Sequence, residues 1–296
     1  MVDFIHNNKD RYGVDAICRV LPIAASTYYR TLYLINNPEF RAKRALHDLH
    51  HAEQIKRIWK ESSGRYGIRK VWQQLRREGY VIARCTVVRL MRKLDIQGVW
   101  RGKNKQTTRS RDDQKRADDL VKRNFKADHP HHLWVADFYI QTNSGWVYTA
   151  FIIDVFSRAI VGWKVSTRMN TDMVLDALEQ ALRDRGMPKN VIHHSDRGVQ
   201  YLSIRYTNRL EAANLRASVG TTGDSYDNAL AETVNGLYKT EVIEYLKADW
   251  QGLADVQLAT LNWVDWFNKK RVHSYVSPFE FEAMYYDKIN PLGLVA

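Results

Sequence analysis

The chain has 296 residues, which suits two or three domains and leaves ample length for a hydrophobic core. Its two cysteines, Cys18 and Cys85, lie far apart and outside any CxxC pattern, which argues against a disulfide framework and against a cysteine-based zinc site. The net charge of +12 indicates a polyanionic partner, usually a nucleic acid, and leaves an ordinary basic soluble protein as the alternative.

The positive charge is concentrated in the first part of the chain. Residues 1–130 hold 29 basic and 14 acidic side chains, whereas residues 131–296 hold 16 and 19. This asymmetry suggests a nucleic-acid-binding region attached to a second domain. No apolar run reaches the roughly 18 residues of a membrane span, and the N-terminus lacks the order of a signal peptide, so we expect a cytoplasmic protein.

The first 62 residues are predicted to form a helical region that can include a helix-turn-helix. Residues 14–33 have the pattern of two short helices around a proline-containing break, with Ser26 or Thr27 near the N-cap of the second. Residues 39–62 predict a longer, highly charged helix with apolar residues at helical spacing. The cluster "HDLHH" in that helix is interpreted as an exposed face rather than as a metal site.

Two apolar stripes in residues 63–99 predict a pair of short amphipathic helices joined by the turn "GYVIA". This arrangement is typical of a helix-turn-helix, whose second helix enters the DNA major groove. A basic helical hairpin that packs on its neighbour is the alternative, but the local excess of positive charge favours DNA binding. The candidate DNA contacts are basic or hydroxyl side chains of this segment: Arg69, Lys70, Arg84, Thr86, Arg89 and Arg92.

A basic linker is predicted next, because residues 100–129 carry many charges and few apolar side chains. The second domain then begins with three strand patterns that indicate an antiparallel meander. An amphipathic helix at 171–186, which ends at Gly186, leads to a strand, a helix, a strand and two more helices. This order predicts an α/β fold with a mixed five-stranded sheet. The three meander strands are expected at 133–141, 146–155 and 159–166, and the later strands at "NVIHHS" and "LRASVG".

Two carboxylates fall at unusual places in these strands. Asp137 lies in the middle of the first strand, where an unpaired buried charge is costly, and Asp196 lies at the carboxyl end of the fourth. If these strands are neighbours, both side chains can point to one edge of the sheet. Asp154, at the end of the second strand, is a rival, for which we favour a structural role in a turn, with Arg158 as a candidate partner.

A third acidic residue cannot be chosen by spacing alone, because residues 224–244 contain several. On a helix that begins near Asn228, the residues Glu232, Asn235 and Lys239 recur at helical steps and form one polar face, which singles out Glu232. Asp227 is interpreted as a possible cap of that helix. Three convergent carboxylates suit two Mg²⁺ or Mn²⁺ ions, which can activate the attacking oxygen and stabilise the leaving oxygen at phosphorus.

Three blocks of the second domain resemble the motif blocks of the DDE transposases and retroviral-type integrases: "LWVADFYI", "HHSDRGVQY" and "DNALAETVNGLYKTEVI". Between Asp196 and Glu232 lie 35 residues, and Lys239 follows seven positions after Glu232, a spacing specific to that group. The tail "WFNKKRVHSYVSPFEFE" and the upstream "YGIRKVWQQL" are similar to segments of bacterial insertion-sequence transposases. The chain most resembles the downstream-frame (OrfB) product of the IS-three family.

The resemblance implies an RNase H-like, integrase-type catalytic core, preceded by an all-α helix-turn-helix region that binds double-stranded DNA. It implies that Asp137, Asp196 and Glu232 are catalytic metal ligands. It also implies that the protein is found in the bacterial cytosol or nucleoid. Element ends would be cleaved by water, and the freed 3′-hydroxyl would attack a second phosphodiester. Homo-oligomers that bridge two DNA ends are expected, with or without an upstream OrfA product. Further candidate DNA contacts are His194, Arg197, Asn228, Asn235 and Lys239.

Two other functions stay open at this level. A DNA-binding accessory protein, inactive without an OrfA segment, would carry the same motifs. A nuclease of RNase H type is disfavoured by the basic helix-turn-helix and by the spacing of the carboxylates. The expected divisions of the chain are 1–62 helical region, 63–99 helix-turn-helix, 100–129 linker, 130–285 catalytic domain and 286–296 tail.

Overall fold

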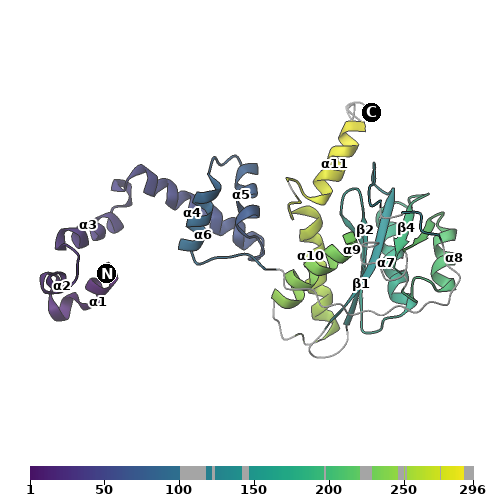
Figure 1. The fold of residues 1–296 in the computed structure, drawn as a ribbon, viewed down its shortest axis with the longest axis horizontal. Helices are drawn as coiled ribbons and strands as arrows, with labels where there is room; N and C mark the ends of the chain where they lie inside the picture. The colour runs from purple at the N-terminus through teal and green to yellow at the C-terminus, as the bar shows by residue number, and fades with distance from the viewer. Residues whose placement is uncertain are drawn as a thin grey trace. The chain divides into compact units, whose positions relative to one another are not determined.

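The computed structural model forms two compact units, Met1–Gln97 and Gly98–Ala296, and we describe each by itself. The helices and strands follow in the order shown in Figure 1. The structure describes residues 1–100, 118–121, 124–141, 147–196, 198–220, 229–245, 250, 252–273 and 275–289. Most of the predicted linker therefore lies outside the described residues.

The N-terminal unit is entirely helical. Its first three helices share a small core formed by Ile5, Ile17 and Tyr28. The N-cap of the third helix is Ala24, two residues before Ser26, and no side chain caps the helix. The helices are α1 (Val2–Tyr12), α2 (Val14–Val20), α3 (Ala25–Asn36), the 3₁₀ turn η1 (Pro38–Phe40), α4 (Lys43–Glu61), α5 (Ile68–Arg77) and α6 (Arg84–Lys93).

The predicted pair of amphipathic helices is confirmed as α5 and α6. Both helices pack against α4, which the sequence assigned to the preceding region, so the three form one helical group. The indole of Trp72 donates a 2.9 Å hydrogen bond to the carbonyl of Ile82 and thereby fixes the turn between α5 and α6. The buried side chains of the group are Ile55, Ile58, Val71, Leu75, Val87, Leu90 and Met91.

The C-terminal unit contains the predicted mixed five-stranded sheet, in the order β3-β2-β1-β4-β5. The first three strands pair antiparallel, whereas β4 pairs parallel with both β1 and β5. The predicted meander and fold class are thus confirmed. The strands are β1 (Leu133–Gln141), β2 (Val147–Asp154), β3 (Ile160–Ser166), β4 (Ile192–Ser195) and β5 (Arg216–Val219).

Helices cover both faces of this sheet, as Figure 1 shows. On one face α7 packs on β2 and β3, and α8 packs on β5. On the other face α9 packs on β1 and β2, and its residue Tyr238 contacts Phe151 with 5.0 Å between ring centroids. The helices are α7 (Thr171–Asp184), α8 (Ile204–Ala212), α9 (Ala229–Tyr238) with the π-helical turn η3 (Lys239–Glu244), α10 (Leu253–Lys269) and α11 (Pro278–Ile289).

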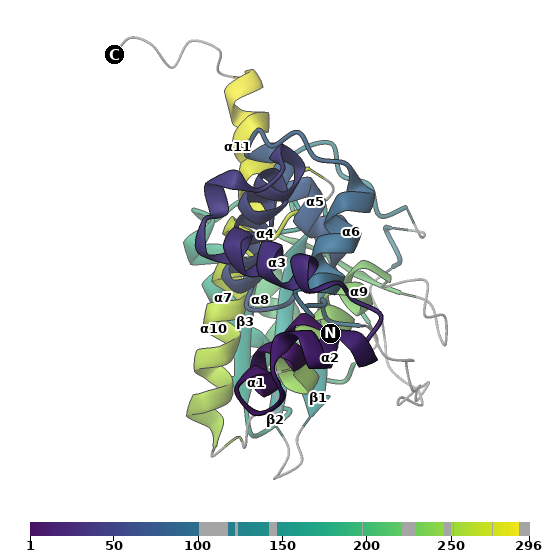
Figure 2. The same ribbon diagram turned by 90° about the vertical axis from the view of Figure 1, so that its left-hand side faces the viewer.

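Local sequence explains where several of these helices begin and end. Asn170 caps α7 by accepting a hydrogen bond from the backbone N–H of Met173, and Ser203 caps α8 in the same way. Gly186, with φ +68°, follows α7 as predicted. The last helix, α11, contacts α10 and runs past the domain boundary expected at residue 285 (Figures 1 and 2). Among the described helices, none has the length and apolarity needed to span a bilayer.

Candidate active site

The parallel pairing of β1 and β4 brings the two strand carboxylates together. Ala136 is the register partner of Ser195. Asp137 is the next residue on β1, and Asp196 directly follows the end of β4, so the two residues continue this pair. Sequence reasoning required β1 and β4 to be neighbours for this pair to form, and the sheet order meets that requirement.

Asp137 belongs to the sheet face that α9 covers, and alternation extended past the end of β4 assigns Asp196 to the same face. Side chains alternate between faces along a strand, so Asp137 shares its face with Val135, and Asp196 continues the parity of His194. Val135 and His194 are themselves register partners. The residues of the opposite parity, such as Trp134, lie in the core beneath α7 and α8. The helix that carries Glu232 therefore packs on the same face as the carboxylate pair.

The carboxyl group of Asp196 is half-buried at the end of β4. Burial raises its pKa above the ordinary value, because removal from water disfavours the charged form. The backbone N–H of Gly198 opposes this effect by donating a 2.9 Å hydrogen bond to Oδ1. A bound cation would favour the ionised carboxylate further, which makes this group suited to metal binding.

Tyr201 is a site residue that sequence reasoning missed. Its side chain is buried, and its pKa is raised by burial first and then by the charges of Tyr206, Asp196 and Asp137. The hydroxyl group thus experiences both strand carboxylates. The Tyr201 ring packs edge-on against Tyr206, whose hydroxyl lies 3.0 Å from Nε2 of His193. A buried aromatic group therefore supports the chain immediately after Asp196. The only sequence signal for this role of Tyr201 was an aromatic residue five positions after Asp196.

Glu232 is exposed in the first turn of α9. The described residues contain no group of three His, Cys, Asp or Glu side chains arranged to hold a metal ion. The structure therefore brings Asp137 and Asp196 together and places Glu232 on the helix that covers their face, without closing a three-ligand cluster. Asp227 and Asn228, predicted to precede this helix, lie outside the described residues.

The predicted polar face of α9 is wrong at Asn235. This residue is 7% exposed, because the buried side of the helix runs through Val234, Asn235 and Tyr238. A buried amide cannot serve as the expected DNA contact in this conformation. Lys239, by contrast, is half-buried, and its Nζ lies 3.7 Å from Oε1 of Glu244.

A π-helical turn continues α9 and carries a buried ion pair that the sequence did not reveal. Glu241 accepts hydrogen bonds from the guanidinium of Arg271, at 2.7 Å to Nη2, and from the indole of Trp263, at 3.0 Å. Arg271 also lies over the ring of Phe267. These contacts join the π-helical turn to α10 and to the segment that follows it, and so hold the helix of Glu232 against the rest of the unit.

The two candidates that flank Asp196 have different outcomes. His194 is 1% exposed, its Nδ1 lies 2.9 Å from the hydroxyl of Ser218, and its ring contacts Phe125. Its predicted contact with DNA phosphate is therefore wrong, because β4 lies between two other strands and His194 packs inside the unit. Arg197 lies outside the described residues.

Asp154 has the structural role that the sequence favoured. It is fully buried, and its Oδ1 accepts hydrogen bonds from the backbone N–H and the hydroxyl of Ser157, while Oδ2 accepts from the N–H of His131. These partners replace the suggested partner Arg158, which contributes its backbone N–H to the carbonyl of Asp154. The residue thus ties the turn after β2 to the start of β1.

The helix-turn-helix candidates are mostly available at the surface. Lys70 lies over the ring of Tyr66, and Thr86 is half-buried at the start of α6. Arg89 donates a 2.7 Å hydrogen bond to Asp48 of α4, and this bond lowers the pKa of the Asp48 carboxyl. The exposed candidates are Arg69, Arg84, Arg89 and Arg92.

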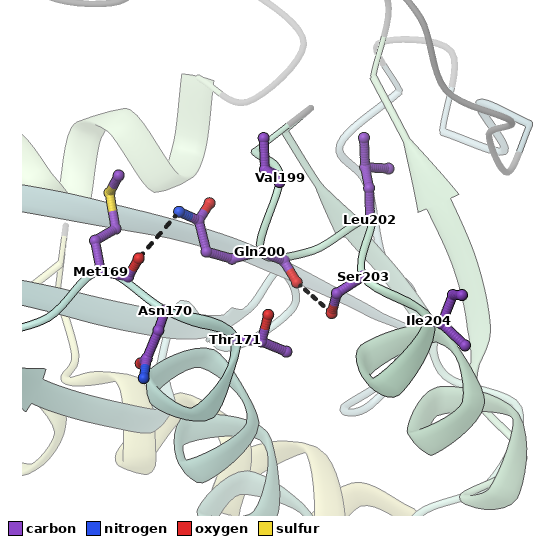
Figure 3. A pocket seen from close by; sticks show the side chains of 8 residues that line it. All are labelled: Met169, Asn170, Thr171, Val199, Gln200, Leu202, Ser203 and Ile204. Atoms are coloured by element: carbon purple, nitrogen blue, oxygen red, sulfur yellow. Dashed lines mark hydrogen bonds between the residues drawn. The ribbon is translucent and has the colours of Figure 1, made fainter.

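A pocket of about 540 Å³ lies beside the loop that follows Asp196 (Figure 3). Gln200 crosses this pocket to donate a 3.4 Å hydrogen bond to the carbonyl of Met169, and the hydroxyl of Ser203 donates to the carbonyl of Gln200. The loop after β4 is thereby tied to the loop before α7. Neither Asp137 nor Asp196 lines the pocket.

Comparison with known proteins assigns both units to families. An integrase core domain matches residues 127–225, a second integrase core model matches 213–276, and an HTH-like domain matches 47–104. The chain is 49% identical to the transposase for insertion sequence element IS629 of Shigella sonnei, over 100% of both chains. The chain belongs to the insertion-sequence transposases.

One further relative of this transposase is more distant. The chain is 31% identical to transposase InsF for insertion sequence IS3A of Escherichia coli strain K12, over 94% of this chain and 97% of that protein. Among solved structures, the HTLV-2 integrase catalytic core domain in complex with magnesium is 18% identical, with a TM-score of 0.43 over 53% of this chain and 99% of that chain. The HTH-like match covers most of α4 together with α5 and α6, in agreement with their packing.

Proposed function

We propose that this transposase cleaves DNA strands at the ends of an insertion element and transfers the freed 3′-hydroxyl to another phosphodiester. The observation that carries the proposal is the parallel pairing of β1 with β4, in which Ala136 is the register partner of Ser195 and each of the two carboxylates is the next residue along the chain. Membership of the insertion-sequence transposases supplies the reaction class.

The donor set fits a hard divalent cation. Asp137 and Asp196 offer carboxylate oxygens, the ligand type that Mg²⁺ and Mn²⁺ prefer, and burial of Asp196 disfavours its ionised form unless a cation compensates. Glu232 is the third proposed ligand, reached by an adjustment of the first turn of α9. Two bound ions would supply electrophilic stabilisation of the attacking and leaving oxygens.

The proposed reaction has two steps. In the first step, water attacks a phosphodiester, the P–O bond to the 3′-oxygen breaks, and a 3′-hydroxyl end forms. In the second step, this hydroxyl attacks another phosphodiester, loses its proton and displaces that strand's 3′-oxygen.

The chain's own residues would position the DNA. We propose that the duplex is held through its phosphates and bases by three exposed side chains of α6: Arg84, Arg89 and Arg92. Arg69, Lys70, Thr86 and Lys239 remain proposed DNA contacts.

Two DNA ends must meet for element transfer, so we propose a homo-oligomer as the active form. An OrfA product is a proposed additional partner. The alternative function, a regulatory DNA-binding subunit that is inactive alone, predicts DNA binding without strand cleavage by this chain.

The test uses the full chain, labelled DNA carrying the terminal repeats of the element that encodes it, and Mg²⁺ or Mn²⁺. We expect nicking and strand transfer that EDTA abolishes. Asp137→Asn, Asp196→Asn and Glu232→Gln should each remove cleavage and weaken Mn²⁺ binding, measured separately by electron paramagnetic resonance, while DNA binding persists. Glu211→Gln, an exposed carboxylate on α8, is the matched control and should retain cleavage.

Two results would count against the proposal. Full cleavage by Glu232→Gln would refute the role of that residue. DNA binding without any nicking by the unaltered chain would favour the regulatory alternative, and addition of an OrfA product would then show whether activity depends on it.

A further inference from the structure

Helices α2 and α3 lie ahead of the HTH-like match, which begins at residue 47. Four residues, Leu21 to Ala24, connect the two helices, and both helices contact α1. Ile17 and Tyr28 belong to the core that the three helices share. Figure 2 labels all three helices. Two short helices joined by a three- to four-residue turn are the framework of a helix-turn-helix. This group is separate from the α5–α6 pair and calls for its own functional assignment.

The start of α3 repeats the start of α6 in sequence. An isoleucine, an alanine, a threonine and an arginine occur at the same relative positions before and within the first turns of both helices. The residue after the threonine is hydrophobic and buried in both cases, Tyr28 at 1% exposed and Val87 at 0%. The matching positions are Ile23, Ala24, Thr27 and Arg30 in the first helix start and Ile82, Ala83, Thr86 and Arg89 in the second.

The backbone repeats as well. Ala24 has φ −73° and ψ 141°, and Ala83 has φ −72° and ψ 143°. In each helix the threonine N–H donates a 3.0 Å hydrogen bond to the carbonyl of that alanine, and neither helix has a side-chain cap. The chain therefore enters α3 and α6 with the same geometry, and it presents equivalent residues on equivalent faces.

The face of α3 opposite its core is suited to a nucleic acid. Ser26, Tyr29, Arg30 and Tyr33 are all exposed and recur at steps of three and four residues, so they share one side of the helix. The helix contains no carboxylate. Arginine, serine and tyrosine donate hydrogen bonds to phosphates and base edges, and they do so from recognition helices in the major groove.

We propose that residues 2–36 form a second helix-turn-helix that binds double-stranded DNA, with α3 as its recognition helix. Arg30 takes the place that Arg89 holds in α6. Because α3 carries one basic residue and α6 carries four, the second module makes few phosphate contacts and adds little to the salt dependence of binding. The transposase would then contact an element end at two separate segments.

The full chain and a duplex carrying the element's terminal repeat provide the test. DNA footprinting should show two protected segments. Arg30→Ala should remove protection of one segment and weaken binding about tenfold, the effect of losing one good base contact. Arg92→Ala should remove the other segment. Arg11→Ala, which removes an exposed positive charge from the last turn of α1, should leave both segments protected.

Tyr33→Ala serves as a second variant of the same face, and thermal unfolding checks that each variant is folded. An unchanged footprint in both Arg30→Ala and Tyr33→Ala would overturn the proposal. The proposal would also be overturned if these variants changed the oligomeric mass measured by light scattering but left the footprint unchanged. Such a result would identify the face as a protein-docking surface. These outcomes are independent of strand cleavage, because no variant alters the proposed metal ligands.

Discussion

Arg271 and Glu241 form a buried ion pair, with Nη2 of the arginine 2.7 Å from Oε1 of the carboxylate. Glu241 is 6% exposed and Arg271 is 5% exposed. The pair connects the π-helical turn after α9 to the segment after α10. π-helical turns inserted in α-helices occur often at functional sites, and this one follows the helix that carries Glu232.

Removal of one partner should be strongly destabilising. Glu241→Gln leaves the guanidinium of Arg271 buried without its counter-charge, which costs about 3–5 kcal/mol. Urea unfolding followed by tryptophan fluorescence measures the loss, since Trp263 contacts Glu241 directly. The double variant Glu241→Leu with Arg271→Met should recover much of it. Asp265→Asn, which breaks an exposed pair with Lys269, is the control and should change stability by less than about 1 kcal/mol.

Gly162 on β3 should tolerate no side chain. A Cβ atom there would lie 2.2 Å from the carbonyl oxygen of Ala177 and 2.9 Å from the Cβ of Ala181, both on α7. Gly162→Ala should therefore force α7 away from the sheet and destabilise the protein by roughly 1–3 kcal/mol, visible as a lower Tm. Gly252→Ala is the matched control, because its φ of 171° is extended and nothing lies within 4 Å of the added atom. Equal Tm values for the two variants would contradict this close approach.

His193 should make stability depend on pH. Burial lowers its pKa from 6.5 to about 4, so the folded protein keeps this ring neutral where the unfolded chain takes up a proton. The free energy of unfolding is unaffected by this group above pH 6.5. It decreases as the pH falls from 6.5 toward 4, by no more than about 1.4 kcal/mol per pH unit. His193→Gln should flatten the free energy of unfolding between these pH values. An unchanged slope in the variant would assign the pH dependence to other groups.

Asp48 should restrain DNA binding by holding Arg89. Asp48→Asn removes the charged acceptor, and the freed guanidinium can contact a phosphate. We expect tighter binding to duplex DNA at low salt and a plot of log K against log salt that is steeper by about 0.9. Glu53→Gln also removes one negative charge from α4, but it frees no arginine, and it should leave that slope unchanged. A similar effect of both variants would indicate a general charge effect.

The sequence predicted the sheet well because each strand has a recognisable local pattern of apolar residues. Alternation and apolar runs predicted β1 to β5, and a glycine, Gly186, after an amphipathic segment predicted the end of α7. The pairing of Asp137 with Asp196 needed one further fact, the parallel contact of β1 with β4, which follows from tertiary packing and has no local signal. The sequence therefore predicted the two members of the pair, but it predicted their proximity only on the condition that β1 and β4 are neighbouring strands.

The errors have equally specific causes. His194 was predicted to contact DNA phosphate as a neighbour of Asp196, but β4 lies between β1 and β5 and the side chain is buried. Asn235 was assigned to a polar face because its periodicity with Glu232 and Lys239 was read as regular α-helix. The helix instead buries Asn235 and changes its repeat at Lys239, where the π-helical turn begins.

The parallel contact between β1 and β4 also affects when the proposed site can exist during synthesis. β1, β2 and β3 can pair as soon as they leave the ribosome, because each is next to its neighbour in the chain. β4 must wait until α7 has emerged and crossed back to β1, and Glu232 emerges later still. A growing polypeptide therefore carries Asp137 without Asp196 until 59 further residues have been added. The host chromosome meets the assembled carboxylates only when the transposase is nearly complete.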